Sequence, residues 1–122
     1  METAELVQRY LDNWNETDPA VRRAAVAAVW ADDARYVDPL VSVAGHDQIS
    51  GVIGAFHEQM PGYVFRLLDD NVDSHHNIAR FRWELVPAAG GESVAIGFDV
   101  AVTGDDGRIE NVLGFLDMAP GS

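Results

Sequence analysis

The ten residues Trp30-Ala31-Asp32-Asp33-Ala34-Arg35-Tyr36-Val37-Asp38-Pro39 decide how this chain is organised. A residue before proline avoids the helical region of backbone conformation, so Asp38 is expected to end a short strand. Side chains alternate along a strand, which puts Tyr36 and Asp38 on one face and Val37 on the other. The segment therefore predicts a carboxylate held at a strand end. The alternative is that Asp38 and Pro39 only open a turn, a common use of this pair.

Three helices are predicted around this segment. The first is indicated by one apolar face that consists of Leu6, Val7, Tyr10, Leu11 and Trp14. The second begins at Pro19, because Asp18 is a good N-cap and proline suits the first helical position, and it is expected to run to about Trp30. The third is predicted from Gly45 to Pro61.

From Tyr63 onward the apolar residues alternate with polar ones, which is typical of strands. Strands are predicted at about 63–69, 78–87, 92–103 and 108–118, with a weaker extended segment at 72–77. The glycine-containing segments 87–91 and 104–107 suit hairpin connections. We therefore expect a single α+β domain over residues 1–122, with three N-terminal helices packed on a curved antiparallel sheet.

The composition excludes several classes of partner and site. The 122 residues carry a formal net charge of −12 and include neither lysine nor cysteine. Such a surface repels phosphate backbones and anionic lipids, so no nucleic-acid or membrane partner is expected. The absence of cysteine excludes disulfides and thiolate metal sites and favours a cytoplasmic location. No apolar run is long enough to span a membrane, and no signal peptide is recognised before the first helix.

The strand predicted at 92–103 has two different faces. One face carries Val94, Ile96, Phe98, Val100 and Val102. The other carries Ser93, Ala95, Gly97, Asp99, Ala101 and Thr103. Small residues around one acid suggest space for a ligand, with Asp99 facing into it. The alternative is that the branched face is core and Asp99 faces water.

If Asp99 faces a pocket, the branched face points outward and must be covered by another apolar surface, most simply that of a second copy of the chain. A homodimer is therefore expected.

These features resemble the NTF2-like, SnoaL-like superfamily. The resemblance is carried by Trp30-Ala31-Asp32-Asp33-Ala34 followed by Asp38-Pro39, by the hairpin at 99–109 and by the three-helix beginning. It covers nearly the whole chain and implies a cone-shaped α+β barrel with a deep apolar cavity, usually dimeric. The superfamily includes isomerases, polyketide cyclases, dehydratases, epoxide hydrolases and non-enzymatic binders, so the fold does not define the reaction.

Within the superfamily, ketosteroid isomerase is the mechanistic relative that aligns best. The resemblance implies that Asp38 is the general base, and that Asp99, protonated, forms an oxyanion hole with Tyr10. It also puts Phe56, Phe81, Trp83 and Leu85 on the apolar wall, and the full expected substrate-binding set is Trp14, Trp30, Phe56, His57, Phe81, Trp83, Leu85 and Leu116. Trp30 and His57 stand where that isomerase has tyrosines. No cofactor is implied.

The remaining polar residues leave alternatives open. His57 lies on or beside the apolar stripe of the third helix, so it is either a hydrogen-bonded core histidine or a cavity residue. His75 and His76 are adjacent on extended chain and point to opposite faces, so no metal site is expected. Arg80 and Arg82 share the strand face opposite Phe81, which favours surface ion pairs, with Glu84 or Asp117 as partners. An epoxide-hydrolase-like Asp-Arg-Asp cluster would instead need an arginine inside the cavity.

Two classes of function follow from these residues. The first is an enzyme, of the isomerase, cyclase or dehydratase type, that performs cofactor-independent acid–base chemistry on a small hydrophobic carbonyl compound. The second is a non-catalytic domain that uses Asp99 and Tyr10 only to orient a small hydrophobic ligand. A cavity-facing Asp38 near Asp99 favours the enzyme. An Asp38 whose carboxylate is engaged as a helix cap favours the binding domain.

Overall fold

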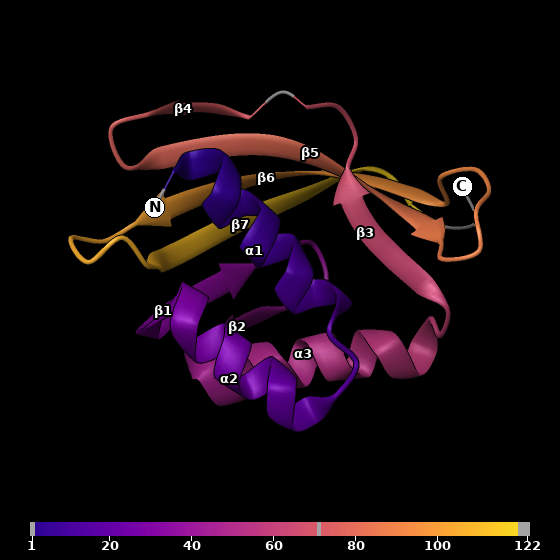
Figure 1. Cartoon of the computed structure of the whole chain (residues 1–122), viewed down its shortest axis with the longest axis horizontal. Coiled ribbons are helices and arrows are strands. Elements are labelled where there is room, and N and C mark those ends of the chain that lie inside the picture. Colours follow the sequence, from indigo (N-terminus) through magenta and orange to yellow (C-terminus); the bar gives the residue numbers. More distant parts are fainter. Residues whose placement is uncertain (1, 71, 120–122) are drawn as a thin grey trace.

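The computed structural model describes residues 2–70 and 72–119, which form three helices and seven strands (Figure 1). The elements are α1 (Thr3–Asn15), α2 (Pro19–Val29), β1 (Trp30–Val37), β2 (Ser42–Ala44), α3 (Gly45–Gln59), β3 (Tyr63–Leu67), β4 (Asp73–His75), β5 (Ile78–Pro87), β6 (Ala95–Thr103) and β7 (Ile109–Met118). The predicted α+β class is confirmed. Within the described ranges, no helix has the length and apolar character needed to cross a membrane.

The strands form one curved sheet in the order β2-β1-β7-β6-β5-β3, with β4 paired to β5 (Figure 1). Every pair is antiparallel except β1 with β7, which is parallel. The sheet is therefore mixed, and the expectation of a purely antiparallel sheet is wrong on this point. Hairpins impose antiparallel pairing on β5, β6 and β7, whereas β1 is far from β7 in the sequence and its direction follows from the packing of the helices.

The second helix begins as predicted and ends one residue early. Asp18 Oδ1 accepts hydrogen bonds from the backbone nitrogens of Ala20 and Val21, at 2.9 and 3.1 Å, and Pro19 occupies the first helical position. Trp30 already has extended backbone, with φ −104° and ψ 141°, and it begins β1. The chain thus passes directly from α2 into the strand that leads to Asp38.

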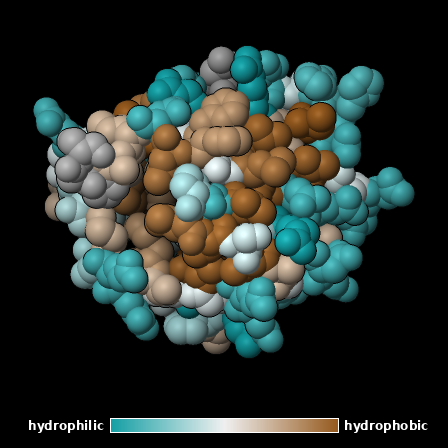
Figure 2. Space-filling model, turned by 180° about the vertical axis from the view of Figure 1, so that it is seen from behind, coloured by the Kyte–Doolittle hydropathy of each residue, from teal (hydrophilic) through white to brown (hydrophobic). Residues whose placement is uncertain are grey.

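The two faces of β6 differ in the way the sequence indicates. Ala95, Gly97, Asp99 and Ala101 are buried on the concave face, under the helices. The branched face is only half-buried and, together with the exposed Leu113 and Phe115 of β7, makes an outer apolar surface (residues 96, 98, 100, 102, 113 and 115). Phe98 and Phe115 face each other across this surface, with ring centroids 6.4 Å apart. Figure 2 shows a broad hydrophobic area bordered by hydrophilic residues on the side of the molecule opposite to the view of Figure 1.

Not all the space beside the small residues of β6 is empty. Gly97 pairs directly with Trp83 of β5, and a Cβ atom at residue 97 would overlap the Trp83 indole ring. The missing side chain of Gly97 therefore seats Trp83 against the sheet. This placement keeps the Trp83 indole beside Asp99, which lies two residues after Gly97 on β6.

The substitution Gly97→Ala is expected to destabilise the fold, because the added methyl group must displace a packed indole. Overpacking of this kind costs about 1–3 kcal/mol. The measurement is urea unfolding followed by tryptophan fluorescence. The matched control is Gly51→Ala, since Gly51 lies within α3 and a Cβ atom there meets nothing within 4 Å. The control is expected to be neutral or stabilising, as alanine is the better helix former. An unchanged stability of Gly97→Ala would contradict the proposed packing of Trp83.

Candidate active site

A cavity of about 460 Å³ lies between α1, α3 and the concave face of the sheet. Its lining is mainly apolar and includes six aromatic residues from the helices and the concave face: Tyr10, Trp14, Tyr36, Phe56, Phe65 and Trp83. Several of these rings contact one another, for example Trp14 with Phe65 at 5.4 Å and Phe65 with Trp83 at 5.1 Å between centroids. A cavity of this size and character suits a small hydrophobic molecule.

Asp99 supplies a buried carboxyl group at the inner end of this cavity. It lies on β6 and is only 2% exposed. The hydroxyl of Tyr10, which lies on α1 and is also 2% exposed, donates a hydrogen bond of 2.8 Å to Asp99 Oδ2. Trp30 packs against the Tyr10 ring at 5.6 Å, and Phe81 packs against it edge-on at the same distance. The helix and its aromatic neighbours thus hold Tyr10 against the acid.

Burial raises the pKa of Asp99 from 3.8 to about 6. Hydrogen bonds from Tyr10 and Trp83 oppose this shift, and the nearby charge of Asp38 adds to it. The Asp99 carboxyl group therefore holds its proton up to about pH 6, and in the protonated form it can act as a hydrogen-bond donor. Burial, followed by the charge of Asp99, also raises the pKa of Tyr10, which therefore remains a neutral hydroxyl.

Asp38 lies immediately after β1 and has two roles in the structure. Its Oδ1 atom accepts hydrogen bonds from the backbone nitrogens of Leu40 and Val41, at 2.8 and 2.9 Å, so it stabilises the turn that follows. Its side chain is half-buried and also lines the cavity. The turn and the cavity roles were alternatives in the sequence, but one carboxylate has both, because the turn uses only one of its oxygens.

The two acids meet at Gly114 of β7. Gly114 pairs with Asp99 across the sheet. A Cβ atom at residue 114 would lie 2.9 Å from Asp99 Oδ1 and 3.4 Å from the Cβ atom of Asp38. Any larger residue here would press on both acids, so Gly114 leaves the space in which they approach each other.

Trp14 contributes a buried donor to the same wall. Its Nε1 atom has no acceptor in hydrogen-bonding geometry among the described residues, although it is close enough to the Tyr10 oxygen to lower the pKa of that hydroxyl. Buried N–H groups are normally paired, and an unpaired one has a free-energy cost. An oxygen atom of a bound ligand is a suitable acceptor for this group.

The structure gathers most of the predicted site residues around the cavity. Those in its lining are Tyr10, Trp14, Asp38, Phe56, Trp83, Leu85, Asp99 and Leu116. Three others lie outside the lining. Trp30 is fully buried behind Tyr10, and its Nε1 donates to Asn13 Oδ1 at 3.0 Å. His57 is turned about 100° from Phe56 around α3, and its Nε2 donates to the Trp14 carbonyl oxygen at 2.6 Å.

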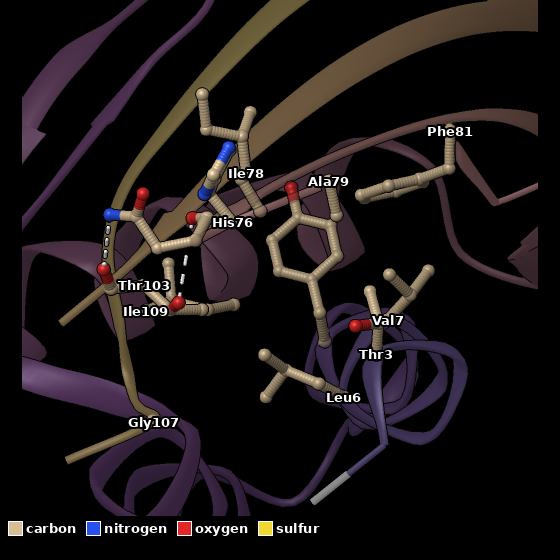
Figure 3. Close-up of a pocket in the computed structure, with 13 residues that line it drawn as sticks. Thr3, Leu6, Val7, His76, Ile78, Ala79, Phe81, Thr103, Gly107 and Ile109 are labelled. Atoms are coloured by element: carbon tan, nitrogen blue, oxygen red, sulfur yellow. Dashed lines mark hydrogen bonds between the residues drawn. The ribbon is translucent and has the colours of Figure 1, made fainter. Parts of the chain in front are cut away.

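Phe81 is the third predicted site residue that lies outside the lining of the main cavity. It lies beyond Tyr10 because the sheet is long and curved. It lines a smaller cavity of about 190 Å³, whose other walls come from the first turns of α1 and from the chain on either side of the β4–β5 and β6–β7 turns (Figure 3). Among the described residues, Tyr10 alone belongs to the linings of both cavities. No carboxylate is found among the described residues that line the smaller cavity, so it does not offer the same chemistry.

Two residues of the site were not predicted. Gly114 gives no signal in the sequence, because its importance depends on pairing with Asp99. The sequence puts Tyr36 on the same strand face as Asp38 but does not by itself assign it to the site. Its hydroxyl donates to Asp38 Oδ2 at 2.6 Å, and it lines the cavity. The alternation of side chains along β1 was the signal that could have identified it.

The arginines and histidines stay outside the main cavity, whose lining in the described part of the chain contains no arginine or histidine. Arg82 pairs with Asp117 at 3.5 Å, as expected, whereas Arg80 pairs with Asp73 at 3.1 Å. The Asp-Arg-Asp cluster is therefore not formed. Residues 2–70 and 72–119 contain no group of three or more side chains that could hold a metal ion.

Replacement of Asp99 by asparagine is expected to change how stability depends on pH. The folded protein holds the Asp99 proton up to about pH 6, whereas the unfolded chain releases it near 3.8. The wild type therefore loses stability as the pH rises through this interval, by about 3 kcal/mol at most. The stability of Asp99→Asn relative to wild type should thus increase between roughly pH 4 and pH 7. Urea unfolding across this range measures it, with the exposed Asp33→Asn as control, and a constant difference would contradict the assignment.

Similarity to known proteins agrees with this fold. A family model described as a SnoaL-like domain matches residues 7–112. A “putative isomerase of the SnoaL-like family” from Agrobacterium tumefaciens is 43% identical over 93% of this chain and 95% of that chain, with a TM-score of 0.87. A “putative ketosteroid isomerase” from Kribbella flavida is 21% identical over 98% of this chain and 81% of that chain, with a TM-score of 0.68. A “putative polyketide cyclase” from Sinorhizobium meliloti is 20% identical over 90% and 93%, with a TM-score of 0.69.

The last two similarities concern the fold alone, and no curated protein matches the chain. The family match and the similarity to the Agrobacterium protein each extend over most of the sequence. The fold, the match over residues 7–112 and the 43% identity lead to one conclusion: the chain belongs to the SnoaL-like, NTF2-like family.

Proposed function

We propose that this protein is an enzyme that performs cofactor-independent acid–base chemistry on a small, hydrophobic, uncharged carbonyl compound. The observation that carries the proposal is the convergence of Asp38 and Asp99 at Gly114, within one apolar cavity. Two carboxyl groups in different environments can act as base and acid at the same pH. Asp38 is half-buried and receives backbone hydrogen bonds, whereas Asp99 is 2% exposed and has a raised pKa.

The roles follow from these environments. The Asp38 carboxylate takes a proton from the carbon next to the carbonyl group, and the electron pair of the broken C–H bond moves to the carbonyl oxygen. Protonated Asp99 donates a hydrogen bond to the resulting enolate oxygen, and the Tyr10 hydroxyl gives up its bond to Asp99 Oδ2 to donate its one proton to that oxygen as well. The enolate then takes the proton back from Asp38 at another carbon, attacks a second carbonyl group whose oxygen takes that proton, or expels a neighbouring hydroxyl group, which leaves as water with the proton from Asp38. These outcomes are an isomerisation, an aldol-type cyclisation and a dehydration.

The charges around the cavity support an uncharged substrate. Its lining has two carboxyl groups and, within the described residues, no cationic side chain to balance a ligand carboxylate or phosphate. An anionic ligand would meet repulsion in a low-dielectric space. The names of similar proteins are compatible with this class, because an isomerase and a polyketide cyclase are among them.

The second candidate is a non-catalytic domain that binds a small hydrophobic ligand. The observation that favours it is the turn after β1, where Asp38 Oδ1 is engaged by Leu40 and Val41. A carboxylate kept for this structural purpose need not exchange protons with a ligand. The two candidates differ in one measurable property, which is proton transfer to and from bound carbonyl compounds.

The test is the exchange of α-protons of bicyclic ketones, such as β-tetralone, in heavy water, followed by proton NMR. The wild type is expected to accelerate exchange, and Asp38→Asn to reduce the acceleration by at least about a hundredfold because the base is lost. Binding of naphthol, an enolate mimic, is the control. It should persist in Asp38→Asn and weaken by about tenfold or more in Asp99→Ala. Naphthol binding without exchange of any ketone would favour the binding domain instead.

We also propose that the outer apolar surface of β6 and β7 is covered by a second copy of the chain. This surface is continuous and apolar, with the ion pair of Arg82 and Asp117 on the same side of the sheet. Two copies of such a face can pack against each other about a two-fold axis. Because the face is apolar, the contact needs no positively charged partner surface, which a chain with net charge −12 does not readily provide. The cytoplasmic location and the absence of nucleic-acid and membrane partners stay predictions.

Light scattering after size exclusion is expected to give about twice the monomer mass of 13.3 kDa at micromolar concentration. Leu113→Asp should dissociate the dimer, because Leu113 is 42% exposed within the outer apolar surface. Val21→Asp is the matched control, since Val21 is 52% exposed on α2. A monomeric wild type, or dissociation by both variants alike, would contradict this interface.

A further inference from the structure

Tyr36 is held rigidly beside Asp38. It lies on β1, is 6% exposed, and packs against the rings of Trp14 and Trp30 at centroid distances of 5.4 and 6.3 Å. Its hydroxyl donates to Asp38 Oδ2 at 2.6 Å. The two residues are separated by one position on the strand, so the same backbone carries both the donor and the acceptor.

The hydrogen bonds of Asp38 leave little of the carboxylate free. A carboxylate offers about four lone-pair sites, two on each oxygen. Oδ1 uses both of its sites for the backbone nitrogens of Leu40 and Val41. Oδ2 uses one site for the Tyr36 hydroxyl. One lone pair, on Oδ2, is therefore left for a proton that comes from a ligand.

Tyr36 itself is suited to donate and not to act as a base. Burial raises the pKa of Tyr36 well above its ordinary value, and the charge of Asp99 and the hydrogen bond to Asp38 raise it further. The hydroxyl thus keeps its proton in the working range of pH. Each acid of the site then has a tyrosine donor of its own, Tyr10 for Asp99 and Tyr36 for Asp38.

We propose that Tyr36 is a positioning residue that orients Asp38 so that its remaining Oδ2 lone pair faces the cavity. The inference rests on the proposed function, because it matters only if Asp38 accepts a proton from a ligand. The backbone nitrogens anchor Oδ1, but they leave the carboxylate plane free to tilt about that anchor. The bond from Tyr36 to Oδ2 adds the second fixed point. Rates of proton transfer depend steeply on such alignment, and a small misplacement can reduce them by about a hundredfold.

The test is Tyr36→Phe in the same ketone exchange assay. This variant keeps the ring that packs against Trp14 and loses only the hydroxyl. The maximal exchange rate is expected to fall by about ten- to a hundredfold. The Michaelis constant of the ketone and the affinity for naphthol should change by less than about threefold, because Asp99 and Tyr10 are intact. Tyr63→Phe is the matched control, as Tyr63 lies on β3 and does not line the cavity.

A double-mutant cycle separates positioning from a general effect on the fold. In Asp38→Glu the longer side chain moves the carboxylate away from the Tyr36 hydroxyl but keeps a base. The effect of Tyr36→Phe on exchange should therefore shrink to less than about threefold in this background. Equal effects in the two backgrounds, or a parallel loss of naphthol affinity, would assign Tyr36 a structural role and overturn the inference.

The outcomes also distinguish this inference from the proposed function. Exchange by the wild type with unchanged exchange by Tyr36→Phe overturns the role of Tyr36 and leaves the proposed function in place. Absence of exchange by the wild type, with no difference from Asp38→Asn, overturns the proposed function and the role of Tyr36 with it. Near-ultraviolet circular dichroism establishes that each variant keeps the native aromatic packing.

Discussion

The burial of the Asp99 carboxyl group against Tyr10 is the constraint on which the rest of the structure depends. A carboxyl group that is 2% exposed needs a hydrogen-bond partner, and Tyr10 supplies it from α1, 89 residues away in the sequence. This bond ties the first helix to the middle of the sheet. It also requires the space at Gly114 and the aromatic support of Trp30 and Phe81 behind Tyr10. Asp99 therefore organises the part of the cavity lining that lies around Tyr10 and Gly114.

The burial of Asp99 lowers the stability of the folded protein. Burial raises the pKa of Asp99 to about 6, so ionising this acid costs more in the folded protein than in the unfolded chain. A neutral residue such as asparagine would fit the fold with less penalty, but it would lack the carboxylic O–H group that donates to the enolate in the proposed mechanism. Active sites commonly retain groups that reduce stability when those groups perform chemistry. In the proposed function Asp99 has this character, whereas the exposed acids that give the chain its negative charge do not.

In the proposed function, the Asp38 side chain meets a structural and a chemical demand together. The turn after β1 needs an acceptor for the nitrogens of Leu40 and Val41, and one carboxylate oxygen provides it. The other oxygen is directed by Tyr36 and remains next to the cavity. The same turn that makes aspartate favourable before proline thus also fixes its orientation. A local preference of the backbone and the geometry of the site are satisfied by the same bonds.

Much of the fold could be predicted because its elements are encoded locally. The helical spacing of apolar residues identified all three helices, and Asp18 with Pro19 marked the start of α2 within one residue. The alternation along β6 predicted that Asp99 and its small neighbours would be buried, and the structure confirms it. The short strand β2 was missed, since three residues carry too little periodicity to be recognised.

The sequence by itself determined the secondary structure, the faces of the strands and the residue types available for chemistry, because these depend on neighbours along the chain. Only the tertiary structure decided which residues meet. The parallel pairing of β1 with β7 brings Asp38 beside Gly114 and Asp99, and no local pattern specifies that pairing. Likewise, the indole of Trp83 fills the space over Gly97, and the curvature of the sheet moves Phe81 out of the main cavity. Contacts between distant segments follow from how the whole core packs, which is a property of the three-dimensional structure.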